Sequence, residues 1–113
     1  MDDVDNYVAI CAIDDVTPDL PYKGRLNEID LAVFQVEDAY YVTQDICTHG
    51  PGSLSEGYVE GAEIECPFHQ GRFSIITGAP LAPPCTVPLK IWNVVMRDDQ
   101  IMIDKTSVGQ TAT

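Results

Sequence analysis

Two short stretches, C-T-H-G at residues 47–50 and C-P-F-H-Q-G-R-F at residues 66–73, decide how this chain is interpreted. Each begins with a cysteine and places a histidine soon after it, among glycine and proline. The four residues concerned are Cys47, His49, Cys66 and His69. Both histidines of the chain belong to this set. Thiolate and imidazole groups spaced in this way indicate a metal centre.

Two kinds of metal centre fit two cysteines and two histidines. One is a binuclear iron–sulfur cluster, in which the cysteines bind one iron and the histidines bind the other. The other is a tetrahedral zinc ion, but zinc fingers usually group cysteine with cysteine and histidine with histidine. Here each half is mixed, as two adjacent loops require if each gives one ligand to each iron. The spacing therefore favours one [2Fe–2S] cluster, with zinc and a catalytic Cys–His pair as the alternatives.

The residues around the ligands resemble a known family. The chain is similar to the Rieske ferredoxins of bacterial multicomponent aromatic-ring-hydroxylating dioxygenases, of the naphthalene, biphenyl and toluene type. The resemblance runs from about Leu31 to Asp104 and is weak over the first thirty residues. It is strongest in A-V-F-Q-V (32–36), Y-Y-V-T-Q-D-I-C-T-H-G (40–50), E-G-Y-V-E-G-A-E-I-E-C-P-F-H-Q-G-R-F (56–73) and T-G-A-P (77–80).

This resemblance implies a fold and a function. The fold would be the all-β Rieske fold, an antiparallel sandwich or barrel with a small cluster-binding subdomain of two loops, at about residues 46–84. The function would be that of a one-electron carrier, not an enzyme, holding one Rieske-type [2Fe–2S] cluster. It would take electrons from a flavin-dependent NAD(P)H ferredoxin reductase and pass them to a terminal Rieske non-haem iron dioxygenase of aromatic hydrocarbon catabolism. The alternative is a Rieske-type small subunit of another reductase complex, such as one associated with nitrite reductase.

Neighbours of the ligands have expected roles of their own. Glycines let the backbone come close to the sulfurs and direct N–H groups at them, and the Ser53 hydroxyl could also donate. Pro67 stiffens the second loop. The expected neighbours of the cluster are Gly50, Gly52, Ser53, Phe68, Gln70 and Gly71.

Compared with respiratory-chain Rieske proteins, four positions differ. Gly52 and Phe68 stand where those proteins carry an extra pair of cysteines, so no disulfide joins the two loops here. Gly71 and Phe73 stand where those proteins carry a serine and a tyrosine that donate to sulfur. The loss of two donors predicts a potential near the bottom of the Rieske span, which runs from about −150 to +300 mV.

Length and charge narrow the function further. The 113 residues suit one domain, and the net charge of −12 excludes nucleic acid and disfavours anionic membranes as partners. An acidic monomeric carrier suits partners with basic patches, although the acidity could also serve solubility alone. A Rieske oxygenase is excluded, since its second iron needs two further histidines. Without a signal peptide or an apolar span in the sequence, we expect a cytoplasmic protein.

Short segments bounded by turn residues predict β-structure throughout. We expect a proline-rich loop at 78–84 and a frayed tail at 105–113. Cys11 is expected to pack in a strand, as is Trp92, and Cys85 is left without an assigned role. The predicted strands are 7–13, 22–26, 29–36, 39–45, 57–60, 62–65, 72–76, 88–96 and 100–104.

Overall fold

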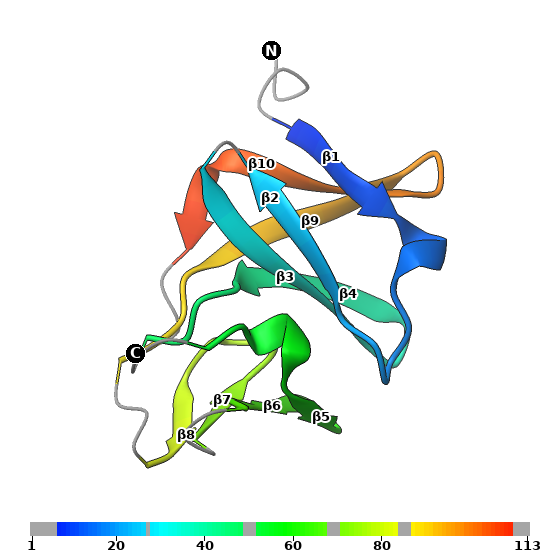
Figure 1. The fold of residues 1–113 in the computed structure, drawn as a ribbon. Coiled ribbons are helices and arrows are strands. Elements are labelled where there is room, and N and C mark those ends of the chain that lie inside the picture. The colour runs from blue at the N-terminus through cyan, green and yellow to red at the C-terminus, as the bar shows by residue number, and fades with distance from the viewer. Residues whose placement is uncertain (1–6, 27, 49–51, 68–70, 84–86, 110–113) are drawn as a thin grey trace.

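The computed structural model describes residues 7–26, 28–48, 52–67, 71–83 and 87–109, with the side chains of 105–109 left aside. In these residues the chain forms two antiparallel sheets and two short 3-10 helices (Figure 1). The 3-10 helices are η2 (Ile13–Asp15) and η3 (Leu54–Glu56).

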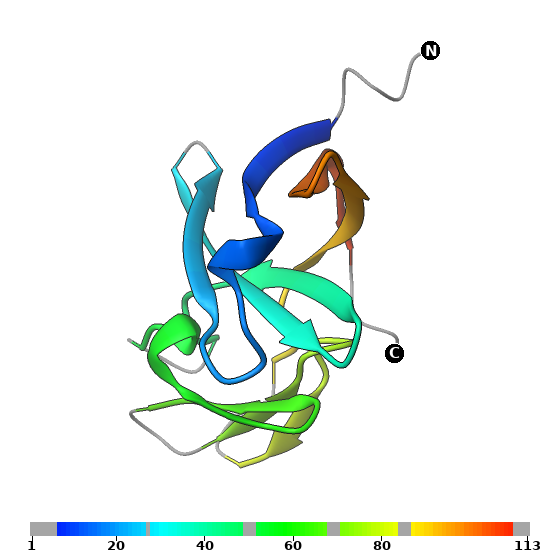
Figure 2. The same cartoon turned by 90° about the vertical axis from the view of Figure 1, so that its right-hand side faces the viewer.

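The larger sheet has six strands in the order β1-β10-β9-β4-β3-β2. The two end strands of this order, β1 and β2, contact each other, so the sheet curls into a near-barrel (Figures 1 and 2). Its strands are β1 (Tyr7–Ala12), β2 (Tyr22–Leu26), β3 (Ile29–Val36), β4 (Ala39–Gln44), β9 (Ile91–Arg97) and β10 (Gln100–Gly109).

The smaller sheet has four strands in chain order and lies at one end of the near-barrel (Figure 1). Its strands are β5 (Tyr58–Glu60), β6 (Glu63–Glu65), β7 (Arg72–Ser74) and β8 (Pro80–Ala82). The predicted all-β architecture with a smaller cysteine-bearing part is therefore confirmed.

Strand β3 lies between the near-barrel and the smaller sheet and contributes side chains to the buried cores of both. Its L-A-V-F stretch is buried on both faces, since each of its four side chains is at most 1% exposed. Neighbouring side chains of a strand point to opposite faces. Leu31 and Val33 enter the core of the near-barrel with Trp92, whereas Ala32 and Phe34 enter a second core that contains the cysteines. A continuous apolar run thus fixes the site-bearing sheet against the near-barrel.

The structure differs from the predicted elements in the proline-rich segment and at the C-terminal strand. The proline-rich segment contains β8, because Phe73 and Arg72 of β7 pair with Pro80 and Ala82 there. Strand β10 continues beyond residue 105 to Gly109, where its backbone pairs again with β9 after an irregularity that follows Ile103. The rest of the predicted frayed tail, 110–113, lies outside the described residues.

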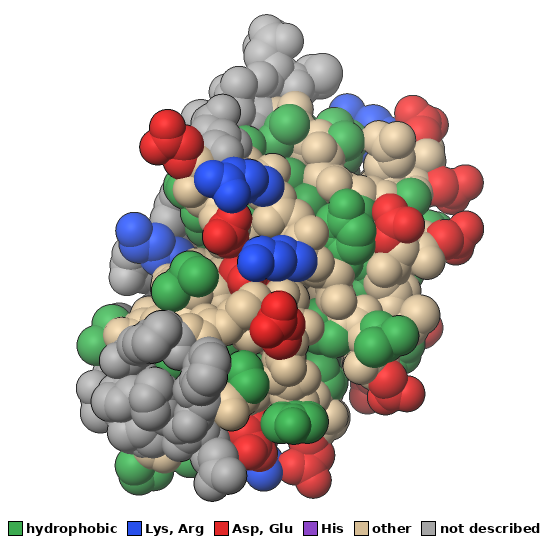
Figure 3. Space-filling model, viewed as in Figure 1, with side chains coloured by type: hydrophobic (Ala, Val, Ile, Leu, Met, Phe, Trp, Pro, Cys, Tyr) green, Lys and Arg blue, Asp and Glu red, His purple; other side chains and the backbone are tan. Residues whose placement is uncertain are grey.

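Acidic side chains are spread over the face seen in Figure 3, with a few lysines and arginines among them. None of the helices in the described part of the chain has the length and apolar character that a bilayer-spanning segment needs.

Candidate metal centre

Each of the two cysteine loops is closed by a backbone hydrogen bond, and the two bonds join equivalent positions. The N–H of Cys47 donates to the carbonyl of Gly52 at 2.9 Å, and the N–H of Cys66 donates to the carbonyl of Gly71 at 2.8 Å. Each loop is therefore a short closed turn that starts at its cysteine, and the two turns are built alike. His49 and His69, together with Gly50, Phe68 and Gln70, lie between these anchor points and outside the described residues.

The cysteines of the two loops belong to one buried cluster of side chains. Cys47 is 3% exposed and Cys66 is 0% exposed, and Leu54, Ile64 and Phe73 pack in the same cluster. The structure thus brings together the two sulfurs that the sequence separates, in surroundings that exclude water. Two buried cysteines at the start of adjacent closed loops fit the thiolate half of a [2Fe–2S] site.

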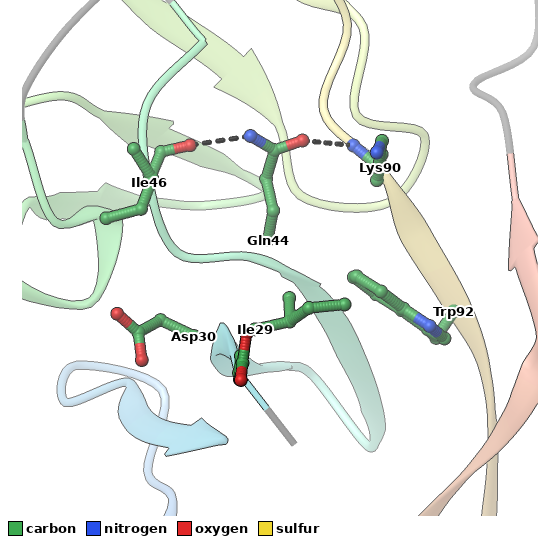
Figure 4. Close-up of a pocket in the computed structure, with 7 residues that line it drawn as sticks. Ile29, Asp30, Gln44, Ile46, Lys90 and Trp92 are labelled. Carbon is green, nitrogen blue, oxygen red and sulfur yellow. Dashed lines mark hydrogen bonds between the residues drawn. The ribbon is translucent and has the colours of Figure 1, made fainter. Parts of the chain in front are cut away.

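The first loop is supported by residues on both sides of its neck. Ile46 and Ser53 form an isolated antiparallel bridge across it. The Gln44 side chain donates to the Ile46 carbonyl at 2.7 Å and accepts from the Lys90 N–H at 2.8 Å (Figure 4). Beside this bridge is a groove of about 340 Å³, whose lining is Glu28, Ile29, Asp30, Gln44, Ile46, Lys90 and Trp92.

A third segment, 87–90, is held against the first loop. The Thr48 hydroxyl donates to the Val87 carbonyl at 2.7 Å, and the Leu89 N–H donates to the Gly78 carbonyl at 2.9 Å. Leu89 packs into the cluster that contains both cysteines. Sequence reasoning missed Thr48, although its place between Cys47 and His49 was a signal that it belongs to the loop.

The second loop connects β6 to β7, and Arg72 ties these strands together. Its guanidinium lies 2.8 Å from Glu60, 3.3 Å from Glu63 and 3.2 Å from Glu65. The hydrogen bonds to Glu60 and Glu63 raise the pKa of Arg72. One cation therefore offsets part of the negative charge that β5 and β6 bring to this end of the molecule.

Two glycines explain the E-G-Y-V-E-G stretch. A Cβ at Gly57 would overlap the carbonyl oxygen of Glu65, so the chain can pass this close to β6 only without a side chain. Gly61 has a φ of +61° and forms the turn between β5 and β6, as predicted. The two glycines thus determine where β6 lies, and with it Cys66, which directly follows β6.

The other predicted neighbours of the cluster are placed as follows. Gly52 and Gly71 are buried and accept the loop-closing bonds. Phe73, where respiratory-chain Rieske proteins carry a tyrosine, is 0% exposed and packs in the same buried group of side chains as both cysteines. The Ser53 hydroxyl donates to Oδ2 of Asp45, so its hydrogen is directed at a carboxylate.

Two further residues singled out in the sequence, Cys11 and Trp92, belong to the near-barrel core. Cys11 is a free thiol that packs against that core, and burial, followed by the charge of Asp15, raises its pKa to about 11. Trp92 is 4% exposed in the same core, which confirms the packing role predicted for it. Cys85 lies outside the described residues.

Comparison with known proteins agrees with this geometry. The profile of the Rieske [2Fe-2S] domain matches residues 6–93. Ferredoxin CarAc of Metapseudomonas resinovorans is 42% identical over 98 residues, which are 86% of this chain and 92% of that protein. The match therefore includes part of the first thirty residues, where the resemblance in the sequence was weak.

Solved structures give the same result. A ferredoxin of Sphingomonas yanoikuyae B1 has a TM-score of 0.85 and 39% identity, covering 88% of this chain and 98% of that one. A chain in the complex of reduced oxygenase and oxidized ferredoxin in carbazole 1,9a-dioxygenase has a TM-score of 0.82 and 38% identity, covering 96% and 97%. With its paired loops, its buried cysteines and these relatives, the chain belongs to the Rieske [2Fe-2S] domain family.

Proposed function

We propose that this chain is the ferredoxin component of a bacterial aromatic-ring dioxygenase system, a one-electron carrier between a flavin-dependent NAD(P)H reductase and a terminal oxygenase. The observation that carries the proposal is the match to ferredoxins over almost their whole length, 92% of one and 98% of another. We place it in the cytoplasm, as a monomer.

The residues of this chain would bind the cluster and keep it dry. Cys47, Cys66, His49 and His69 would hold a [2Fe–2S] cluster, which supplies one-electron redox chemistry when bound. Phe73 and the other buried apolar side chains that pack around the two cysteines exclude water from the cysteine sulfurs. The closed turns at Cys47 and Cys66 restrict the loops, so that oxidised and reduced forms would differ little in geometry.

The surface near the first loop suits a transient partner. Ile46 is 47% exposed and Val87 is 54% exposed. Ile46 comes two residues before Thr48, and the Val87 carbonyl accepts a hydrogen bond from the Thr48 hydroxyl. The chain as a whole carries a net charge of −12, and Lys90 and Lys23 lie close to this loop. Exposed apolar side chains near the loop of an acidic protein fit an oxygenase and a reductase that combine apolar contacts with basic residues around their own redox centres.

Reconstitution tests this function. Purified chain is combined with the reductase and terminal oxygenase of a carbazole- or naphthalene-type system, and NAD(P)H-driven reduction of the oxygenase is followed in stopped flow. We expect reduction to require the chain and to fail with Cys47→Ala. Full cluster content without electron transfer to any such oxygenase, but with stable co-purification in a larger reductase complex, would favour the small-subunit alternative.

A further inference from the structure

We propose that Asp45 is a positioning residue that fixes the first ligand loop, and that its charge, opposed by Lys23, sets the reduction potential of the cluster from outside the ligand set. The inference rests on the cluster that the family implies, and does not depend on which proteins exchange electrons with it.

Asp45 is fully buried at the neck of the first loop. It is 0% exposed, directly after β4 and two positions before Cys47. Its Oδ1 accepts from the Ser55 N–H at 2.8 Å, and its Oδ2 accepts from the Ser53 hydroxyl. A carboxylate has only acceptor sites, and here both oxygens have donors from the far side of the neck.

The backbone of Asp45 is held as firmly as its side chain. Its N–H donates to the Asp30 carbonyl at 2.9 Å, and its carbonyl accepts from the Leu54 N–H at 2.7 Å. Together with the bridge between Ile46 and Ser53, these bonds join the strand that enters the loop to the segment that leaves it. The loop is therefore fixed at its base by protein contacts alone.

Lys23 of β2 brings the opposite charge to the same carboxylate. Its Nζ lies 3.8 Å from Oδ2 of Asp45, and its side chain is 50% exposed. The two charges differ in their exposure to solvent. A buried charge acts through protein and is screened weakly by salt, whereas a half-exposed ammonium group is screened strongly.

This arrangement predicts effects of opposite sign on the potential. Reduction adds an electron to the cluster, which a nearby fixed negative charge opposes and a nearby positive charge favours. Asp45 should therefore lower the potential, and Lys23 should raise it. A purely structural role for the pair would not produce opposite signs, because removal of either partner would loosen the same loop.

The variants can separate charge from hydrogen bonding. Asp45→Asn keeps the shape: its Oδ1 can still accept from Ser55, and its amide can donate to the Ser53 oxygen. That reversal frees the Ser53 hydrogen, so Ser53→Ala and the double variant Asp45→Asn with Ser53→Ala are compared as well. Lys23→Gln removes the positive charge, and Lys23→Glu reverses it. Asp38→Asn, at the exposed turn between β3 and β4, changes the net charge equally at a remote place.

Each variant is purified with its cluster, and iron, acid-labile sulfide and the electron paramagnetic resonance spectrum are measured first. Spectroelectrochemistry at low and at high salt then gives the potential. We expect Asp45→Asn to raise the reduction potential, both alone and combined with Ser53→Ala. High salt should reduce this shift only slightly. Lys23→Gln should lower it, Lys23→Glu should lower it further, and both shifts should shrink in salt. Ser53→Ala and Asp38→Asn should leave it near the wild-type value.

Three results would overturn the inference: an unchanged potential in a fully loaded Asp45→Asn variant, shifts of the same sign for Asp45→Asn and Lys23→Gln, or no shift in either Lys23 variant at low salt. If Asp45→Asn fails to assemble a cluster, the Lys23 pair still decides the electrostatic part. Full loading of Asp45→Ala, which removes both acceptors, would refute the positioning part.

Discussion

Cys47 and Cys66 start separate loops, and yet they pack in one buried cluster with 3% and 0% exposure. Each loop is closed by a hydrogen bond from the cysteine N–H to the carbonyl of the glycine at the end of the turn. Two similar loops that converge on one dry core form a site in which each loop can supply one thiolate and one imidazole.

Replacing any one of Cys47, Cys66, His49 and His69 by alanine should abolish the cluster, because one of the two irons would lose one of its two protein ligands. Iron, acid-labile sulfide and the visible spectrum of each purified variant provide the measurement. Cys11→Ser is the matched control, since this thiol lies in the near-barrel core, and Cys85→Ser is a second one. Full cluster content in any of the four alanine variants would remove that residue from the ligand set.

Electron transfer between this chain and its partners should slow as salt rises. The net charge of −12 attracts basic partner surfaces over long range, and screening shortens that range to about 10 Å at 0.1 M ionic strength. Stopped-flow rates of reduction by the reductase, taken across a salt series, test this. A flat profile would mean that docking depends on apolar contacts such as Ile46 and Val87, with the acidity serving solubility.

Gly71→Ser and Phe73→Tyr should each raise the reduction potential, and together by more than either alone. A hydroxyl at either place could donate to a sulfur, and such a bond strengthens when reduction adds negative charge. Phe73 packs with both cysteines, so the added hydroxyl of tyrosine enters their surroundings. If it found no acceptor there, it would cost about 1–3 kcal/mol of stability. Fully loaded variants with unchanged or lower potentials would contradict this account of a low-potential carrier.

Cys11 should react with iodoacetamide only at strongly alkaline pH. Burial disfavours the thiolate and raises the pKa of Cys11 to about 11, against an ordinary 9.0. Because the thiolate is the nucleophile, the alkylation rate at Cys11 should keep rising above pH 9. Peptide mass spectrometry after timed alkylation locates the modified residue. A rate at Cys11 that levels off near pH 9, as for an exposed thiol, would show that the strand opens in solution.

The sequence contained enough to predict the architecture and the site class, because both depend on local patterns. Paired Cys and His motifs are unusual combinations, and turn residues at 37–38, 61 and 98–99 mark hairpins that the structure confirms. The strand in the proline-rich segment was missed because β8 is three residues long and depends on pairing with β7. Local sequence propensity does not predict a strand of only three residues.

The support of the site was harder to predict, for a physical reason. Asp45 looks like an ordinary polar residue at the end of a strand, and only the fold shows that Ser53 and Ser55 meet it across the loop neck. The same holds for the L-A-V-F run of β3, which predicts burial but cannot show that its two faces serve two different cores. Residues that act through partners distant in sequence need the tertiary structure to be recognised.

The turn between β9 and β10 offers a route to a more stable protein. Asp98 and Asp99 have φ values of 55° and 63°, a left-handed pair that suits a two-residue hairpin but is costly for most side chains. Replacing them with Asn-Gly should stabilise the fold by about 0.5–1 kcal/mol, because asparagine and glycine accept these angles more readily. The backbone bond from the Ile13 N–H to the Asp99 carbonyl, 3.0 Å long, does not depend on the side chain and should persist. The expected gain corresponds to a rise of about 2–5 °C in the midpoint of thermal unfolding followed by circular dichroism. Asp38→Gly is the control: it removes one acidic residue, against two in the Asn-Gly variant, from the turn between β3 and β4, at a position without a positive φ, and should lower the midpoint. A similar rise in both proteins would attribute the gain to reduced charge repulsion and not to the backbone of this turn.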